Sequence, residues 1–197
     1  MVNAAGIARD DITLGLIAGG RATRLGGLDK AWLSRAGVPQ VVRLRERFGP
    51  QVAAVLVSAN LGLDRYASAG FEVVADRVAD AGPIAALEAL AATCRTPWLF
   101  TLPVDVVDVN DCVLRTLAHS QGANGARAHD EDGVQPLVAL WPVAVLREAV
   151  DAALAAREHG IQRLQARLGM AEVRFGGVRF GNLNTPADLA AAGIVTE

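Results

Sequence analysis

Short apolar runs alternate with stretches of helical periodicity along the first half of the chain. Four of the runs have the length of buried strands, at residues 12–17, 52–58, 71–74 and 98–102. Between them, apolar residues recur at helical spacing within residues 41–48, 63–69 and 84–92. Strands and helices that alternate through short connections are typical of a doubly wound, mostly parallel sheet. The pattern therefore predicts an α/β fold of this kind.

The pattern changes in the second half of the chain, where two strands lie close together in sequence. Residues 123–129 and 134–141 flank a polar stretch that ends in Asp132-Gly133, a dipeptide favoured in hairpin turns. We therefore predict a β-hairpin added to the sheet. Pro136 in its second arm predicts an edge position or a bulge, because proline donates no ladder hydrogen bond. The other predicted elements are helices over 109–119, 142–156 and 161–168, a strand pair within 172–180, and a closing helix capped by Thr185.

Length and composition favour a single globular domain. The chain has 197 residues, of which 52% are hydrophobic and 20% are charged, and this is enough to bury a large core. We predict one domain over 1–197, with a disordered tail over 1–10. The net charge of −2 provides no general basic field for nucleic acid or for an anionic membrane. An anionic ligand would therefore have to meet local cations.

The sequence carries no visible targeting or membrane-spanning signal. Its two cysteines, Cys94 and Cys112, do not have the spacing of metal ligands and suggest a reducing compartment. We therefore predict a cytoplasmic protein. The histidines lie on unrelated predicted elements without a cluster of metal ligands around them, and we interpret all of them as surface or core residues: His119, His129 and His159.

The first predicted strand ends in a glycine-rich loop. Ala18-Gly19-Gly20 follows Ile17, and Gly26-Gly27 forms a second glycine pair. Such glycines expose main-chain N–H groups to a bulky anion. The interleaved side chains that can meet a phosphate are Arg21, Thr23, Arg24 and Lys30. The spacing matches neither the P-loop nor the dinucleotide-binding pattern. A plain turn with solvated arginines would not need two glycine pairs around a cation cluster, so we interpret the loop as a polyphosphate site.

Residues 17–30, IAGGRATRLGGLDK, resemble the signature LAGGxxxRMGGxDK of the MobA-type molybdenum cofactor guanylyltransferases. The resemblance extends from residue 12 to residue 189 and implies a Rossmann-like nucleotidyltransferase fold. It also implies transfer of GMP from GTP to molybdopterin, with release of pyrophosphate and with Mg²⁺ as cofactor. Arg24 and Lys30 would act in catalysis by offsetting charge that develops on the leaving pyrophosphate. The residues implied at the nucleotide in this loop are Ile17, Ala18, Gly19, Gly20 and Lys30.

Several polar residues directly follow predicted strands. In a doubly wound sheet the ligand lies beyond the carboxyl ends of the strands, and four residues stand at such ends: Gly19, Ser58, Asp76 and Asp105. Asp105 is the predicted Mg²⁺ ligand and a nucleotide contact, because this ion prefers carboxylate and phosphate oxygens. Its segment, residues 102–106, resembles the family's PCD motif with Val104 in place of the cysteine. A capping role is the alternative for Asp105, and more so for Asp108.

Asp76 is the predicted residue for base recognition. The segment from Asp76 to residue 84 resembles the family's GPLAG region, and a carboxylate here can accept from both N1–H and the 2-amino group of guanine. The family's asparagine at the end of the second strand is Ser58 in this chain, while Asn60 is kept; we predict that both contact the nucleotide. Ser58 keeps open a CTP-using molybdopterin cytidylyltransferase. The other alternative is a non-catalytic protein that binds nucleotide or molybdenum cofactor, against which Lys30 and Asp105 argue.

Two further segments resemble parts of the family that border the second substrate. Gln135-Pro136 matches a QPL segment beside the pterin. Asn182 and Asn184 match a closing NxNTPxDL segment whose asparagines reach towards the metal and phosphates, although both asparagines could instead be turn residues. The resemblance further implies contact with molybdenum-insertion proteins and molybdoenzyme chaperones. It implies no nucleic-acid or membrane partner.

Overall fold

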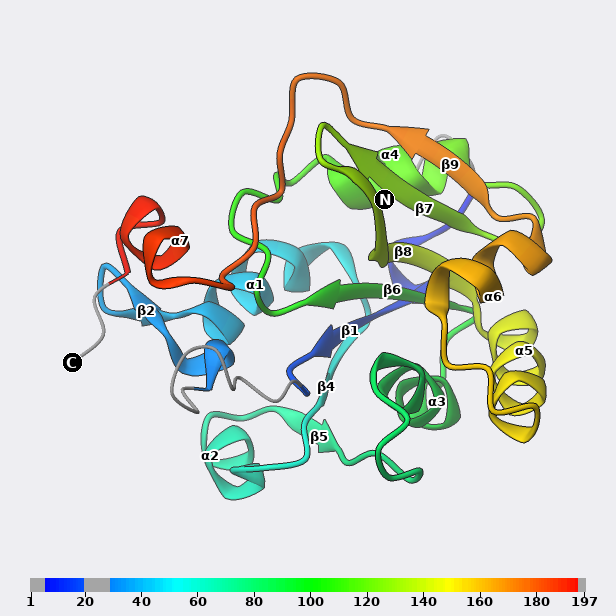
Figure 1. Ribbon diagram of the computed structural model, residues 1–197, viewed down its shortest axis with the longest axis horizontal. Helices are drawn as coiled ribbons and strands as arrows, with labels where there is room; N and C mark the ends of the chain where they lie inside the picture. The colour runs from blue at the N-terminus through cyan, green and yellow to red at the C-terminus, as the bar shows by residue number, and fades with distance from the viewer. Residues whose placement is uncertain (1–5, 20–28, 195–197) are drawn as a thin grey trace.

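The computed structural model describes residues 6–19 and 29–194 and contains one large mixed sheet (Figure 1). Seven strands join this sheet in the order β5-β4-β1-β6-β8-β7-β9. Their bounds are Ile12–Ile17 (β1), Ala54–Ser58 (β4), Glu72–Val74 (β5), Trp98–Pro103 (β6), Ala126–Asp130 (β7), Gly133–Pro142 (β8) and Ala171–Arg174 (β9). Two short strands, β2 (Ser34–Arg35) and β3 (Val38–Pro39), form a separate small hairpin that the sequence pattern did not predict.

The strand directions bring most carboxyl ends to one edge of the sheet, which we call the carboxyl edge. β1 runs parallel to both β4 and β6, and β4 runs parallel to β5. β8 is antiparallel to β6 and to β7, while β7 is parallel to β9. Every strand of the sheet except β8 therefore ends at the carboxyl edge, and β8 begins there. The predicted mostly parallel sheet is confirmed.

Helices cover both faces of this sheet. Their bounds are Gln40–Phe48 (α1), Leu63–Ser68 (α2), Pro83–Thr93 (α3), Val113–Ser120 (α4), Val143–Ala155 (α5), Ile161–Leu168 (α6) and Pro186–Ala191 (α7). Side chains of α1, α2 and α4 share one core with β1, whereas α3, α5 and α6 pack around Trp141 on the other face. Figure 1 shows α7 beside β2, where it packs in a third, smaller core. None of the helices in the described ranges is long and apolar enough to span a membrane.

β1 lies at the buried centre of the sheet, and its packing explains one glycine. All six residues of β1 are buried. A Cβ atom at Gly15 would lie 3.0 Å from Leu90 Cδ1 on α3 and 3.0 Å from Leu99 Cδ1 on β6. Gly15 therefore lets α3 approach the sheet closely.

The predicted hairpin is confirmed as β7 and β8, and a bulge interrupts its second strand. The connection between the strands is Glu131-Asp132, and Gly133 after it has a φ of +116°. Strand pairing moves from Arg127 opposite Ala139 to Ala128 opposite Gln135. The extra residues on β8 include Pro136, so the bulge lies where proline predicts it.

The predicted strand pair over 172–180 is wrong beyond Arg174, where β9 ends. The chain turns at Gly177, whose φ is +71°. Past this turn the main chain contacts the hairpin turn, because Glu131 N donates to Val178 O at 3.0 Å. The turn at Gly177 directs the chain back to the hairpin turn, so that no second strand forms here.

Two element starts also differ from the sequence-based predictions. The helix predicted from residue 109 begins at Val113, because Asn110 Oδ1 accepts from Cys112 N at 3.0 Å and forms a turn before it. At the N-terminus, Ile7 is only 6% exposed and packs into the core, and residues Arg9–Asp11 form a 3₁₀ turn. Ile7 therefore packs against the domain, while Arg9 and Asp10 are exposed.

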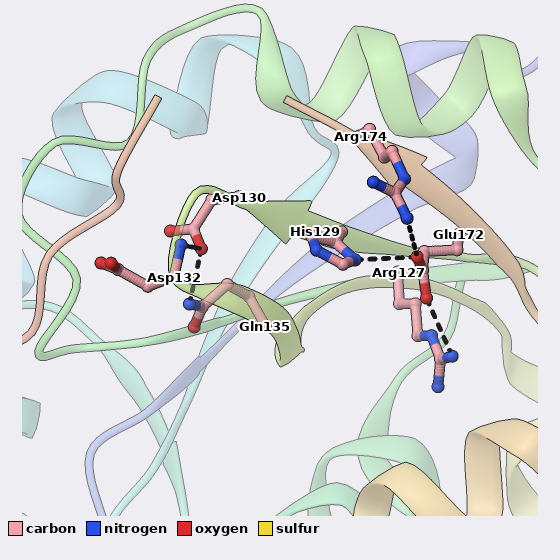
Figure 2. A network of polar contacts seen from close by, with 7 residues as sticks. All are labelled: Arg127, His129, Asp130, Asp132, Gln135, Glu172 and Arg174. Atoms are coloured by element: carbon pink, nitrogen blue, oxygen red, sulfur yellow. Dashed lines mark hydrogen bonds and ion pairs between the residues drawn. The ribbon is translucent and has the colours of Figure 1, made fainter. Parts of the chain in front are cut away.

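A buried carboxylate, Asp130, ties the hairpin to the segment after β9, and Figure 2 shows its contacts with Asp132 and Gln135 in the hairpin. Asp130 is 4% exposed. It accepts hydrogen bonds from Phe180 N at 2.9 Å, from Gln135 Nε2 at 3.0 Å and from Asp132 N at 3.0 Å. Burial alone would raise the pKa of Asp130, but these hydrogen bonds outweigh burial and hold the pKa below its usual value.

Asp130→Asn should lower the free energy of unfolding by about 2 kcal/mol at pH 7, because an amide cannot accept all three hydrogen bonds. The folded-state pKa of Asp130 lies below the unfolded-state value. Its stabilisation is therefore present above the unfolded-state pKa and is lost as the pH falls through the folded-state pKa. The difference between variant and unmodified chain should shrink at acid pH, and urea unfolding at several pH values measures it.

The control on the same turn is Asp132→Ala. This change removes an ion pair between Asp132 and Arg179, whose side chains are 47% and 69% exposed. Exposed ion pairs contribute less than about 1 kcal/mol, so the control should lose little stability. If Asp130→Asn lowered the free energy of unfolding by the same amount at every pH, the hydrogen bonds to the ionised carboxylate would not be the cause of the loss.

Candidate active site

Two clusters of polar side chains lie at the carboxyl edge. The first, which we call the Lys30 cluster, contains Lys30, Asp105 and Asn184. The second, the Asp76 cluster, contains Ser58, Asn60 and Asp76. Three strand spacings, about 14 Å, separate β5 before Asp76 from β6 before Asp105. A ligand that lies along the carboxyl edge, across the end of β1, can reach both clusters.

Lys30 joins three distant parts of the chain. Its Nζ donates to Asp105 Oδ2 at 3.2 Å and to Asn184 Oδ1 at 2.6 Å. The side chains of Lys30 and Asp105 are 20% and 24% exposed, so they are shielded yet open to a ligand. The carboxylate of Asp105 accepts from the side chain of Lys30, and within the described ranges it caps no turn. The arrangement offers a fixed cation next to a carboxylate.

The turn that carries Lys30 is held by Asp29. Asp29 Oδ1 accepts from Ala31 N at 3.0 Å, and Asp29 Oδ2 accepts from the hydroxyl of Tyr66 at 3.3 Å. Burial and then the nearby Asp29 raise the pKa of Tyr66, so its hydroxyl stays protonated and can donate. Sequence reasoning gave Asp29 no role, although its position directly before Lys30 was an available signal.

The segment before α7 brings Asn184 to Lys30. Leu183 N donates to Asp105 O at 3.0 Å. Asp188 Oδ2 then accepts from Asn184 N at 3.0 Å and from Thr185 N at 2.7 Å, which completes the predicted capping box. The hydrogen bond with the side chain of Thr185 is the main cause that lowers the pKa of Asp188. Hydrogen bonds from the main-chain N–H groups of Thr185 and Asn184 lower this pKa further. The side chain of Asn184 contacts Lys30, so its contacts go beyond those of a turn residue.

Asp76 is held from both sides by Ser58, the last residue of β4, and by Asn60, two positions further on. Ser58 Oγ donates to Asp76 Oδ1 at 3.2 Å, and Asn60 Nδ2 donates to Asp76 Oδ2 at 2.7 Å. In return, Asp76 N donates to Asn60 Oδ1 at 2.9 Å. A carboxylate oxygen can accept two hydrogen bonds, so each oxygen of Asp76 keeps a site for a ligand. Three predicted nucleotide contacts therefore lie together.

Only part of the predicted phosphate loop lies within the described residues. Ala18 N donates to Ser58 O at 2.8 Å, and Ile17 O accepts from Val104 N at 3.1 Å. Ala18 thus uses its N–H inside the sheet, and Gly19 is the first residue of the loop whose N–H has no partner among the described residues. The predictions for Gly20, Arg21, Thr23, Arg24 and the pair Gly26-Gly27 concern positions outside the described residues.

The residues predicted on the pterin side are only partly brought together. Gln135 and Pro136 lie near the start of β8, at the carboxyl edge beside β6. The side chain of Gln135 donates to Asp130, and Pro136 O accepts from Gln165 Nε2 at 2.8 Å. Asn182 is exposed, and its carbonyl accepts from Asn184 N at 3.1 Å. Within the described ranges, Asn184 alone of these residues bonds to the Lys30 cluster.

A second network in Figure 2 connects the outer strands β7 and β9. Glu172 Oε1 lies 2.8 Å from His129 Nδ1 and 3.8 Å from Arg174, and Glu172 Oε2 lies 3.2 Å from Arg127. The hydrogen bond from His129 is the main cause that lowers the pKa of Glu172. His129 thus pairs two strands, as expected for a histidine with a structural role.

The donors at Asp105 suit one kind of metal ion. Among residues 6–19 and 29–194, no group of three or more His, Cys, Asp or Glu side chains is placed to hold a metal. Mg²⁺ does not need such a group, since it is often bound by one or two carboxylates together with substrate phosphates and water. Asp105 Oδ1 has no hydrogen-bond partner among the described residues. The residues present therefore fit Mg²⁺ that arrives with a nucleotide.

Comparison with known proteins identifies the class. Residues 15–173 match the family model of the MobA-like NTP transferase domain. The chain therefore belongs to the MobA-like NTP transferase family, and the predicted family is confirmed.

Individual relatives narrow this class. A molybdenum cofactor guanylyltransferase from Cupriavidus necator is 38% identical over 193 residues, which cover 93% of this chain and 96% of the relative. One from Cereibacter sphaeroides is 40% identical over 182 residues, which cover 90% and 93%. The crystal structure of molybdopterin-guanine dinucleotide biosynthesis protein A from Archaeoglobus fulgidus has a TM-score of 0.68 at 18% identity and covers 92% of this chain and 96% of that chain. This last likeness shows the fold.

Proposed function

We propose that this chain transfers GMP from GTP to molybdopterin, which forms molybdopterin guanine dinucleotide and releases pyrophosphate. Its family membership and its guanylyltransferase relatives support this proposal. The structural observation that carries it is the contact of Lys30 with both Asp105 and Asn184 beside the end of β1. A cation and a carboxylate fixed together at this edge suit transfer of a nucleotidyl group with a charged leaving group.

The reaction needs positioning and charge neutralisation more than covalent help. A terminal phosphate oxygen of molybdopterin attacks the α-phosphorus of GTP, and the bond from this phosphorus to the β-phosphate oxygen breaks. The attacking phosphate is ionised at neutral pH, so no general base is required. Lys30 would offset the charge on the departing pyrophosphate, and the N–H of Gly19 would donate to the nucleotide phosphates. Gly20 and Arg24 are proposed to assist in the same way.

We further propose that Asp105 holds Mg²⁺. The ion would supply positive charge to the phosphates, in the manner usual for a hard cation bound by one carboxylate. Lys30 contacts only one oxygen of the Asp105 carboxylate, and this leaves the other oxygen for the ion. Lys30 would therefore orient Asp105 before the ion binds. Asn182, Asn184, Gln135 and Pro136 remain candidates for the pterin side. A cytoplasmic location and contact with molybdenum-insertion proteins and molybdoenzyme chaperones also remain predictions.

The base would be read by Asp76. Guanine presents two neighbouring donors, N1–H and the 2-amino group, and each oxygen of Asp76 keeps one acceptor site. Cytosine presents an acceptor at N3 beside its donor, so the same carboxylate would oppose it. Ser58 does not favour the CTP alternative, because its hydroxyl donates to Asp76.

Asp76→Ala should narrow the preference for GTP over CTP by about tenfold, because the variant loses the acceptor pair. Titration of the purified unmodified and variant chains with GTP, CTP and ATP, each with and without Mg²⁺, measures the preference. The unmodified chain should bind GTP most tightly. A variant that keeps the full preference would show that the base is read by other residues.

A further inference from the structure

The Asp76 cluster is organised so that two of its residues act on the third. Both ends of the Asn60 amide are bonded to Asp76, one to its carboxylate and one to its main-chain N–H. Ser58 donates to the other carboxylate oxygen. We propose that Asn60 and Ser58 are positioning residues that set base specificity: they fix the carboxylate of Asp76 for a purine that presents two donors, and they do not contact the base. This inference rests on the proposed use of GTP.

Burial supports this role for Ser58. Ser58 is 0% exposed, so a ligand at the carboxyl edge cannot reach it. A fully buried hydroxyl needs a hydrogen-bond partner inside the protein, and Asp76 is that partner. The sequence predicted Ser58 as a nucleotide contact, and its burial assigns it to Asp76 instead.

The neighbours of Asp76 are also fixed, so the orientation of its carboxylate is well defined. Ala59 N donates to Val74 O at 3.0 Å, which joins β4 to β5 directly before the cluster. Arg77 makes two hydrogen bonds to Glu88 on α3. On the side of the phosphate loop, a Cβ built at Gly19 would lie 3.7 Å from Asn60 Nδ2. Asn60 thus contacts Asp76 and also lies close to Gly19.

The chemical consequence concerns which bases can use both oxygens of Asp76. Ser58 occupies one acceptor site on Oδ1, and Asn60 occupies one on Oδ2. The remaining two sites match the N1–H and 2-amino group of guanine. Hypoxanthine has the N1–H but lacks the 2-amino group, so it can use only one of them. Loss of Asn60 would free the carboxylate to rotate, and the advantage of guanine over hypoxanthine would shrink.

Steady-state kinetics with GTP and with inosine triphosphate (ITP) test this role. Asn60→Ala should reduce the GTP-over-ITP ratio of kcat/KM by about tenfold, through the KM for GTP and with kcat nearly unchanged. Because Asn60 is exposed, its replacement leaves the core intact. Ser58→Ala removes the other donor at almost constant volume and should also reduce the ratio. A matched control is Asn124→Ala: Asn124 Nδ2 donates to Leu168 O at 2.6 Å next to the start of β7, away from the carboxyl edge. This control should keep the ratio.

A double-mutant cycle separates positioning from direct contact. If Asn60 acts only through Asp76, Asn60→Ala should not reduce the ratio further in an Asp76→Ala background. A further reduction there, or equal losses with GTP and ITP in the single variant, would overturn the inference while leaving the proposed function in place. An unchanged ratio in Asp76→Ala itself would instead overturn the proposed recognition of guanine, and the inference with it.

Discussion

Lys30→Ala is expected to lower kcat by about 10²- to 10³-fold, which is the usual loss when one preorganised charge donor is removed from a transition state. Its cation matters most as negative charge develops on pyrophosphate, so the nucleotide KM should change much less than kcat. The structure adds a second reason, because Lys30 also holds the side chains of Asp105 and Asn184. Steady-state kinetics with GTP as the varied substrate measure both constants.

The control for Lys30→Ala is Arg35→Ala, which removes a cation five positions further along the chain. Arg35 lies 4.0 Å from Asp108 in an exposed ion pair, and such pairs contribute little to stability. This control should keep kcat close to that of the unmodified chain. A Lys30→Ala variant with normal kcat and only a raised KM would show that Lys30 helps binding alone.

Asp105→Asn is expected to lower Mg²⁺-dependent turnover by about a hundredfold or more, since a neutral amide oxygen binds a hard cation weakly. The fold should be kept, because Asp105 is partly exposed and an asparagine oxygen can still accept from Lys30. Raising the Mg²⁺ concentration should recover part of the activity, because the defect lies in metal affinity. Rates measured across a Mg²⁺ titration, together with thermal unfolding, test both statements.

Asp108→Asn provides the matched control for Asp105→Asn. Asp108 follows Asp105 by three positions in the same loop, and its side chain is 70% exposed. It should keep near-normal activity and the same Mg²⁺ dependence. If Asp105→Asn were near-normal at ordinary Mg²⁺ and Asp108→Asn were impaired, the metal ligand would be Asp108.

The framework of the fold was accessible from the sequence because its signals are local. Short apolar runs marked β1, β4, β5 and β6, and the ends of these strands located Ser58, Asp76 and Asp105 at one edge. A turn dipeptide and a proline located the hairpin and its bulge. Each of these features depends on a few neighbouring residues, so pattern reasoning could find it.

The contacts that complete the site were not accessible in the same way. Lys30 meets Asn184 across 154 positions, and Tyr66 meets Asp29 across 37. Neither contact leaves a periodic signal in either segment. The two-residue strands β2 and β3 are too short to show alternation. The segment after Arg174 has strand-like composition, yet Gly177 and the contact of Val178 with the hairpin turn decide its path.

The most direct test of the proposed transfer is a product assay with molybdopterin and either GTP, CTP or ATP, each with and without Mg²⁺. Dinucleotide and pyrophosphate are quantified together. We expect Mg²⁺-dependent consumption of GTP, with equal amounts of molybdopterin guanine dinucleotide and pyrophosphate, and little product from CTP or ATP. Equal use of CTP would contradict the guanylyltransferase assignment, and consumption of GTP without pyrophosphate release would contradict nucleotidyl transfer itself.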